Sequence, residues 1–482
     1  MEQRVTSVKN PLSIVWFRRD LRLKDNPALF EAARAGAILA VYIHEAGTAG
    51  AASQCWLQKS LAALESQLKA RGLALILRQG PPLETLLELA KGSGAQRVLW
   101  NRLYEPGTLA RDKAVKAGLL AAGLGAQSFN GSLLREPWEL KTQQGKPYQV
   151  FTPFYRALVE AGPSRESLGP LPKLQGPAKA PKSVSLASLA LRPKIGWDKE
   201  LYEAWKPGED EAQKALRRFL RQAASRYQEG RDKVALEDGT SLLSPRLHFG
   251  ELSPQQCWEA ALGFGAAEPA AAGGALAFNR QLAWREFSHH LLYHFPRTVS
   301  EPLRPEFKAF PWRRNAALLK AWQQGRTGFP IVDAGLRQLW RTGFMHNRVR
   351  MIAASVLIKD FLIDWRQGAA WFMDTLLDAD LAQNTLGWQW SAGCGADAAP
   401  FFRIFNPALQ GQRFDPQGDY VRRWVPELAA LPDKFIHQPW LAPAKTGYPA
   451  PIVDHAEARE RALELFKGLR AGKKAVSPKG TA

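Results

Sequence analysis

The segment DADLAQNTLGWQW, residues 378–390, combines side chains that seldom occur together in one short stretch. Asp378 and Asp380 lie two residues apart, Asn384 follows them, and the indoles of Trp388 and Trp390 close the segment. A surface loop would not usually carry two tryptophans, and a core helix would not usually carry two acids and an amide. Carboxylates in such a setting need a cationic partner, because an unpaired buried charge is costly.

A cation for these acids is available in GFMHNRVRM, residues 343–351. Helical spacing places Asn347, Arg350 and Met351 on one face. An arginine held inward on that face requires a carboxylate. Asp378 or Asp380 is therefore its expected partner.

A second polar face is predicted on a helix through FNRQLAWREFSHH. Helical spacing places four residues on one face of this helix: Gln281, Trp284, Arg285 and Ser288. That face therefore combines polar and aromatic side chains. The plain alternative is an interfacial helix whose tryptophan is simply packed.

Hydroxyl side chains cluster before a predicted helix in TSLLSPRLHFGELSP. Thr240 and Ser241 follow a glycine, and Ser244 precedes the helical run. Hydroxyls and free backbone N–H groups at such a place can bind phosphate. The ordinary alternative is a helix N-cap.

Arginines stand near aromatic residues at several places in the second half of the chain. Cationic side chains interleaved with stacking surfaces suit a nucleic acid backbone with one base drawn out of the stack. The alternative is that arginine stems merely cover aromatic edges. The arginines concerned are Arg231, Arg285, Arg313, Arg314, Arg348 and Arg403.

The composition of the 482 residues points toward a polyanionic partner. Lys and Arg number 65 against 45 Asp and Glu, which gives a net charge of +20.

No apolar run is long enough to span a membrane, and the N-terminus lacks a signal peptide, so we expect a cytoplasmic protein. Cys55, Cys257 and Cys394 are too far apart for a CxxC metal signature, and we expect buried free thiols and no metal.

Two fold types follow each other along the chain. Strand-like runs at 12–17, 38–44, 73–80 and 96–102, with a helix predicted over 53–72, are typical of βαβ units on a parallel sheet. Residues 161–194 are rich in Pro, Gly and Ser, and helical periods dominate beyond them. No GxGxxG or P-loop motif is present. We therefore predict a doubly wound α/β domain at 1–135, a linker at 136–200, an all-α domain at 201–470 and a disordered basic tail at 471–482.

Taken together, the motifs resemble those of the DNA photolyase and cryptochrome family. They run in order from VWFRRDLRLKDNPAL through TSLLSPRLHFGELSP, WREF, GFPIVDAGLRQL, GFMHNRVRM and DADLAQNTLGWQW to FFRIFNP. The resemblance implies an N-terminal α/β domain for an antenna chromophore and a helical domain that holds a U-shaped flavin adenine dinucleotide (FAD). Within the family, the chain is most like the bacterial enzymes that split cyclobutane pyrimidine dimers with light.

The resemblance also assigns residues to the flavin. Asn384 would sit beside flavin N5, and Gln281 and Trp284 would face the cofactor. The phosphates and adjacent groups would be held by Tyr227, Thr240, Ser241, Leu242, Leu243 and Ser244. The isoalloxazine would be surrounded by Asn347, Arg350, Asp378, Asp380 and Asn384.

Further positions match the family's electron chain and lesion site. Trp388, Trp365 and Trp312 would carry an electron from the surface to the flavin, and we expect these three, with Asn384 and Gln281, to be the catalytic set. The partner would be double-stranded DNA with ultraviolet-induced pyrimidine dimers. The lesion cavity would be lined by Trp284, Trp390, Met351, Asn347 and Gln281, and the DNA backbone contacted by Arg231, Arg285, Arg348 and Arg403.

Two departures from the family pattern leave alternatives open. Enzymes that act on cyclobutane dimers typically carry Glu where this chain has Gln281. Six-four photolyases carry Gln with two histidines, of which His346 matches one while Met351 replaces the other. We expect cyclobutane dimer repair by a monomer, with a six-four photolyase, a cryptochrome-like photoreceptor without repair, or nucleic-acid binding without light chemistry as alternatives.

The second departure concerns the antenna. His44 is compatible with a folate site, but Gly107 and Thr108 stand where folate-binding members show Asn and Glu. The antenna is therefore methenyltetrahydrofolate, a deazaflavin or nothing.

Overall fold

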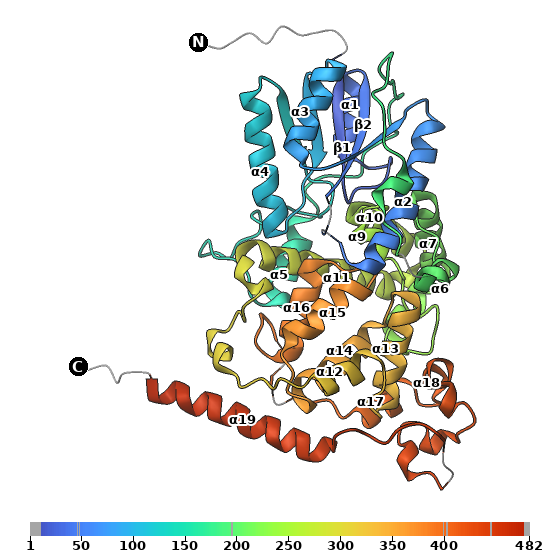
Figure 1. Ribbon diagram of the computed structural model, residues 1–482, viewed down its shortest axis with the longest axis vertical. Helices are drawn as coiled ribbons and strands as arrows, with labels where there is room; N and C mark the ends of the chain where they lie inside the picture. Colours follow the sequence, from blue (N-terminus) through green and yellow to red (C-terminus); the bar gives the residue numbers. More distant parts are fainter. Residues whose placement is uncertain are drawn as a thin grey trace, which may run out of the picture.

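A five-stranded parallel sheet forms one end of the molecule (Figure 1). The computed structural model describes residues 11–476 except 46, 48, 194, 195, 399, 402, 444 and 445. The strand order is β3-β2-β1-β4-β5, which is the doubly wound arrangement predicted. The strands are β1 (Ser13–Phe17), β2 (Ile38–His44), β3 (Leu75–Gln79), β4 (Arg97–Asn101) and β5 (Gly125–Phe129).

Helices cover both faces of the sheet, because the central strands are apolar on both sides. Val15 and Phe17 of β1 pack toward α1 and α2, whereas Ile14 and Trp16 pack toward α3 and α4. These helices are α1 (Pro27–Ala35), α2 (Ala51–Lys69), α3 (Pro82–Ser93) and α4 (Pro106–Ala121).

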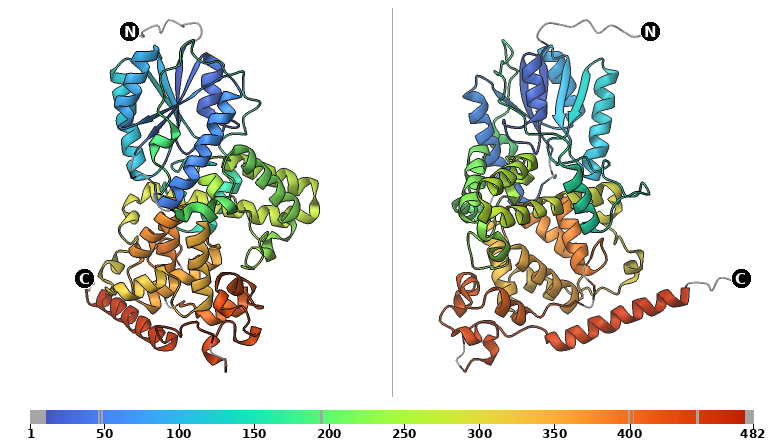
Figure 2. Two further views of the ribbon diagram at one scale, coloured as in Figure 1. Left: turned by 45° about the vertical axis from the view of Figure 1, so that its right-hand side comes forward. Right: turned by 180° about the vertical axis from the view of Figure 1, so that it is seen from behind.

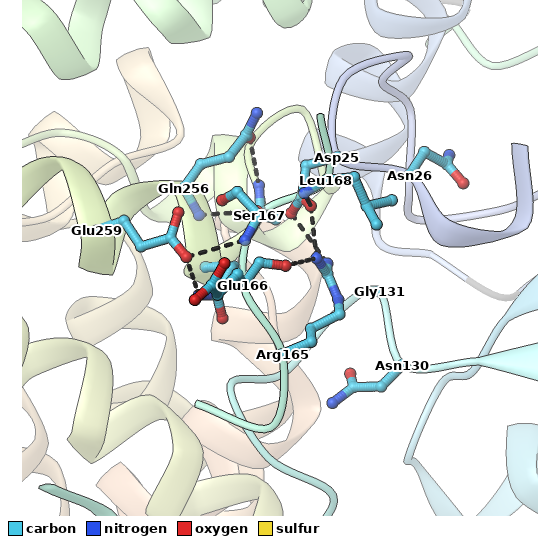
Figure 3. Close-up of polar contacts among 12 residues, drawn as sticks. Asp25, Asn26, Asn130, Gly131, Arg165, Glu166, Ser167, Leu168, Gln256 and Glu259 are labelled. Carbon is cyan, nitrogen blue, oxygen red and sulfur yellow. Dashed lines mark hydrogen bonds and ion pairs between the residues drawn. The ribbon is translucent and has the colours of Figure 1, made fainter. Parts of the chain in front are cut away.

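The segment predicted as a linker is bound to both parts of the molecule. It contains α5 (Phe151–Ala161), two short 3₁₀ turns, η1 (Leu186–Leu189) and η2 (Gly196–Asp198), and the start of α6 (Lys199–Ala204). Figure 3 shows Arg165 paired with Asp25 of the sheet domain, while the backbone N–H of Ser167 donates to Glu259 of α10 at 2.9 Å. These bonds fix the sheet domain against the helices.

The described residues from 209 to 476 are helical apart from connecting loops and an isolated bridge between Arg313 and Ile363. The helical region was predicted from its periodicity. Its helices are α7 (Glu209–Gln222), α8 (Tyr227–Gly230), α9 (Ser244–His248), α10 (Pro254–Ala267), α11 (Ala272–His294), α12 (Ala316–Gln323), α13 (Pro330–Thr342), α14 (Asn347–Ser355), the π-helical η7 (Val356–Asp360), α15 (Trp365–Thr375), α16 (Leu381–Ala392), α17 (Pro407–Phe414), α18 (Asp419–Trp424) and α19 (His455–Val476).

The last helix corrects one expectation. Figure 2 shows α19 along the end of the molecule that lies away from the sheet. Because α19 ends at Val476, residues 471–476 are helical and not disordered. Ala and Lys are good helix formers, so they extend a helix that has already begun. Residues 477–482 of the predicted tail lie outside the described residues.

All three cysteines are buried and free, as predicted. Within the described residues, no helix has the length and apolar character that a membrane crossing requires. The same part of the chain holds no group of three or more His, Cys, Asp or Glu residues placed to bind a metal ion.

Candidate functional site

A cavity of about 560 Å³ lies among the helices. Its walls come from α8, α9, α11, α14, α15 and α16 and from the loops next to them. The structure thus collects most of the residues selected from the sequence at one place. They are Tyr227, Arg231, Thr240, Ser241, Leu242, Leu243, Ser244, Gln281, Trp284, Arg285, Asn347, Arg348, Arg350, Met351, Asp378, Asp380, Asn384, Trp388 and Trp390.

The ion pair expected at this site is present. Nη2 of Arg350 lies 3.0 and 2.9 Å from the two carboxylate oxygens of Asp378. Nε of the same guanidinium donates to the carbonyl of Met345 at 2.7 Å. Of the two acids proposed as partners, Asp378 is therefore the one that pairs with Arg350.

Asp380 has a different environment. One oxygen caps α16 by accepting from the Gln383 N–H at 2.9 Å, and the other lies 3.3 Å from His289 Nε2 and 3.9 Å from His248 Nδ1. Burial alone would raise the pKa of Asp380, but the neighbouring imidazoles of His289 and His248 lower it well below its ordinary value. Asp380 is thus a fixed anion at the cavity wall.

The sequence reasoning missed the two histidines. His289 lies four residues after Arg285, so the polar face predicted on α11 continues by one more turn. Ser288, in contrast, was placed on that face but does not line the cavity; its hydroxyl donates to the Trp284 carbonyl at 2.8 Å. The helical period therefore contained a signal for His289, whereas His248 had none in its own segment.

The loop expected to hold phosphate has an unusual backbone. Leu242 adopts a φ of +53°, a left-handed conformation that is costly for a residue with a Cβ. Leu243 follows with φ −94° and ψ −7°. This change of hand presents successive backbone N–H groups toward one side, which is the geometry of an anion-binding nest.

Two side-chain amides are oriented by main-chain carbonyls. Nε2 of Gln281 donates to the Ala277 carbonyl at 3.2 Å, and Nδ2 of Asn384 donates to the Ala369 carbonyl at 3.0 Å. Each amide therefore keeps its carbonyl oxygen and one N–H for a ligand. Both residues line the cavity.

Trp365 and Trp312 lie outside the cavity lining; Trp365 belongs to the same hydrophobic cluster as Trp388, and Trp312 packs against that cluster. A Cβ built on Gly368 of α15 would stand 2.1 Å from the Trp388 ring, so this indole lies against the α15 backbone. Trp365 is the first residue of α15, about one turn before Gly368. Trp312 precedes Arg313, whose N–H donates to the Leu362 carbonyl at 2.7 Å just ahead of α15.

The arginines expected at the DNA differ in their surroundings. Arg348 lies 2.8 Å from the carboxylate of Asp232, which also neighbours Arg231 at 4.0 Å. Arg403 is exposed outside the cavity, and its carbonyl accepts from the buried Lys359 ammonium at 2.7 Å. Asp232 and Lys359 were not selected from the sequence.

Arg285 is bound within the protein. Its side chain is 13% exposed, and Nη1 donates to the Ser132 carbonyl at 2.8 Å and lies 3.3 Å from Glu286. A guanidinium committed in this way favours a structural role over the expected contact with a DNA backbone.

Comparisons with known proteins give one consistent picture. Residues 13–175 match the model of a DNA photolyase family, and residues 278–468 match that of the FAD binding domain of DNA photolyase. The chain is 48% identical to the deoxyribodipyrimidine photo-lyase of Agrobacterium fabrum over 96% of its own length and 99% of that protein. It is 40% identical to cryptochrome-2 of Arabidopsis thaliana, over 95% of this chain and 79% of that one.

A solved structure supports the same comparison. The crystal structure of a bacterial class III photolyase from Agrobacterium tumefaciens superposes with a TM-score of 0.93 at 48% identity. The match covers 98% of this chain and 100% of that chain.

Proposed function

The chain belongs to the DNA photolyase and cryptochrome family, and from this premise we propose that it splits cyclobutane pyrimidine dimers in DNA with light. The observation that carries the proposal is the composition of one cavity. The acids and hydroxyls assigned to FAD and the stacking tryptophans assigned to the lesion line the same space. A light-driven transfer between cofactor and lesion requires this adjacency.

The residues of the cavity fit FAD. The volume of about 560 Å³ falls within the range of about 300–1,000 Å³ usual for ligand sites. Four residues that line it have a buried polar atom without a hydrogen-bond partner within the protein: His248 Nδ1, Arg348 Nε, Gln383 Nε2 and Trp388 Nε1. Buried polar groups are normally paired, so these atoms favour a polar ligand here.

The roles proposed for these residues are those that the family resemblance implies, and the residues concerned line one cavity. The 240–244 loop would bind the phosphates, and Arg350 with Asp378 would form a neutral pair beside the flavin ring. Asn384 would present its carbonyl oxygen to the ring. Reduced FAD, when bound and excited, would supply the electron that opens the cyclobutane ring and would take it back.

Trp388, Trp365 and Trp312 are proposed as the route by which an electron enters from the surface. Trp365 and Trp388 are buried at 2% exposure each, whereas Trp312 is partly exposed. A row of indoles from the surface to the cavity wall would divide one long transfer into shorter ones.

The lesion would lie against Trp284 and Trp390, with Met351 and Asn347 beside it. Stacking between bases and aromatic rings offsets part of the few kcal/mol needed to unstack the damaged bases. Gln281 would accept a hydrogen bond from a base N–H through its oriented carbonyl oxygen.

His346 provides the reason to favour cyclobutane dimers over six-four lesions. Its Nδ1 accepts from the Arg348 N–H at 3.1 Å, and burial lowers the pKa of His346 to about 4. The ring is therefore neutral near pH 7 and is a poor proton donor. With Met351 at the second position, the chain lacks the pair of histidines that six-four repair uses.

The proposal includes a double-stranded DNA substrate, a monomeric protein and a cytoplasmic location. The antenna, methenyltetrahydrofolate or a deazaflavin, remains a prediction that the absorption spectrum of the purified protein would decide. Light scattering would test the monomer.

The decisive experiment uses the reduced protein and duplex DNA that carries a single defined lesion. We expect blue light to remove the cyclobutane dimer and to leave the six-four lesion unchanged, with no loss of either in the dark. Chromatography of the digested DNA measures both lesions. Persistence of the cyclobutane dimer under light would contradict the proposal.

A further inference from the structure

The indole of Trp284 has only one free face. The ring of Phe151 lies parallel to it, with centroids 3.6 Å apart and an angle of 8° between the planes. Phe287 meets Trp284 edge-on at 5.9 Å. A base that stacks on Trp284 from the cavity must therefore use the face opposite Phe151.

Phe151 does not belong to the helical domain that provides the rest of the cavity. It is the first residue of α5, in the segment between the two domains, and it is 1% exposed. Its ring stacks on Tyr155 of the same helix at 5.7 Å and 19°. The three aromatic rings thus form one continuous stack that ends at the cavity.

Contacts from α11 and from the end of α16 hold this stack in place. The guanidinium of Arg280 lies over Phe151 at 5.3 Å and over Tyr155 at 5.2 Å, and Arg280 is one turn before Trp284 on α11. The Phe151 N–H donates to Asp397 beyond α16 at 3.4 Å. The cation–π contact therefore restricts the ring, and the hydrogen bond fixes the backbone that carries it.

We propose that Phe151 is a positioning residue for lesion recognition, which holds the Trp284 indole flat as a preformed platform for the damaged base. The inference rests on the proposed function, because it assumes that Trp284 meets the lesion. A side chain that is already ordered loses less conformational freedom when it binds, so a fixed indole binds the base more tightly than a mobile one. Phe151 itself touches neither the lesion nor FAD.

The test compares matched variants of the full-length protein with FAD bound. Phe151→Leu keeps an apolar side chain but removes the flat ring, and we expect its Kd for a duplex with one cyclobutane dimer to rise about tenfold, or about 1.4 kcal/mol. Its Kd for the undamaged duplex and its repair rate at saturating protein should not change, since only the platform is affected. Phe151→Tyr retains a planar ring and should restore lesion affinity.

Phe154→Leu is the control, because Phe154 is buried in the same helix and contacts Phe287 and His290 at 5.2 Å each. It should leave lesion affinity unchanged. If Phe151→Leu loses FAD, Phe151→Met, whose unbranched side chain adapts to the available space, replaces it.

The inference is overturned if Phe151→Leu binds the lesion as the unmodified protein does. It is also overturned if Phe154→Leu lowers lesion affinity as much as Phe151→Leu does. The same holds if Phe151→Leu weakens binding to the undamaged duplex as much as binding to the lesion. A protein that shows no preference for damaged DNA before any substitution would instead contradict the proposed function.

Discussion

Asp378 and Asp380 show how two identical side chains, two residues apart, take different tasks. Asp378 pairs with an arginine across the cavity, while Asp380 caps a helix and faces two histidines. The charge of Asp378 is compensated by Arg350, whereas Asp380 is held by the Gln383 N–H and two neighbouring imidazoles. Each acid thus has polar partners from its surroundings, which offset part of the cost of burial.

The Arg350–Asp378 pair makes the first prediction. Arg350→Gln leaves the carboxylate of Asp378, which is 9% exposed, without its cation. We expect a loss of about 2–3 kcal/mol in the free energy of unfolding, at the lower end for such pairs because Arg350 is 23% exposed. Urea unfolding measures the loss, and absorption measures the expected drop in bound FAD.

A second substitution is the control for this pair. Arg350→Gln combined with Asp378→Asn removes both charges and should recover part of the lost stability. A double variant as unstable as the sum of the two single variants would show that the two residues do not interact.

Gln281 supports a prediction about the reaction. Gln281→Glu cannot donate to the Ala277 carbonyl as the amide does, but its carboxylate is a stronger acceptor for a base N–H. These effects oppose each other, so we expect equal or faster repair of cyclobutane dimers and a lesion affinity within about threefold. Single-turnover repair and binding to a lesion-bearing duplex measure both.

Gln281→Leu, which has a similar size and no polar group, is the matched variant. It should weaken lesion binding more than Gln281→Glu does. A fall of more than tenfold in repair by Gln281→Glu would show that the site depends on the amide donor.

Helices and strands with a clear hydrophobic period could be predicted from the sequence. Elements and residues whose positions depend on tertiary contacts could not. Four of the five strands carry apolar runs, but β5, GAQSF, is a partly exposed edge strand without one and was not predicted. The polar faces of α11 and α14 followed from spacing and, apart from Ser288, line the cavity. Phe151 could not be placed from the sequence, because only the packing of α5 on α11 brings it to Trp284.

The contact between α2 and the helices yields a prediction about pH. Glu251 accepts hydrogen bonds from the Trp56 indole of α2 at 2.9 Å and from the Gly208 N–H at 2.7 Å. Burial raises the pKa of Glu251 from 4.5 to about 7, although Arg246 opposes the shift. In that pH range the folded protein keeps a proton that the unfolded chain has released.

The stability linked to Glu251 is therefore complete below its unfolded pKa near 4.5 and is lost as the pH rises through about 7. Glu251→Gln should flatten the fall in unfolding free energy across this window by an amount on the order of 3 kcal/mol. Urea unfolding at a series of pH values measures the slope.

Glu84→Gln removes an exposed carboxylate of α3 and should leave that slope unchanged. Burial also raises the pKa of Glu286 to about 7. Part of the pH dependence of the unfolding free energy should therefore remain in the Glu251→Gln variant. A slope identical to that of the unmodified protein would contradict the assignment to Glu251.

At the scale of the whole molecule, the charge of +20 is arranged around a site that contains acids. Asp378 is paired with Arg350 and Asp380 is buried at the cavity wall, so the cationic excess remains on the exterior. Asp232 reduces that excess locally beside Arg231 and Arg348. Binding to undamaged DNA should therefore depend on a small number of arginines near the cavity and on the ionic strength.

The salt dependence of that binding gives the last prediction. Each phosphate contact adds about 0.9 to the slope of log K against log salt concentration, because condensed counterions are released. Arg403→Ala and Arg348→Ala should each lower the slope by about 0.9 on undamaged duplex, measured by fluorescence anisotropy across a salt series. Arg71→Ala is the control, because Arg71 is exposed and lies far from the helical domain. The first residue of α2, Ala51, bonds to Asp374 of α15, and Arg71 follows the other end of this helix. The 19 residues of α2 span about 28 Å. An equal fall in slope for Arg71→Ala would show that DNA responds to the total charge and not to a defined face of the helical domain.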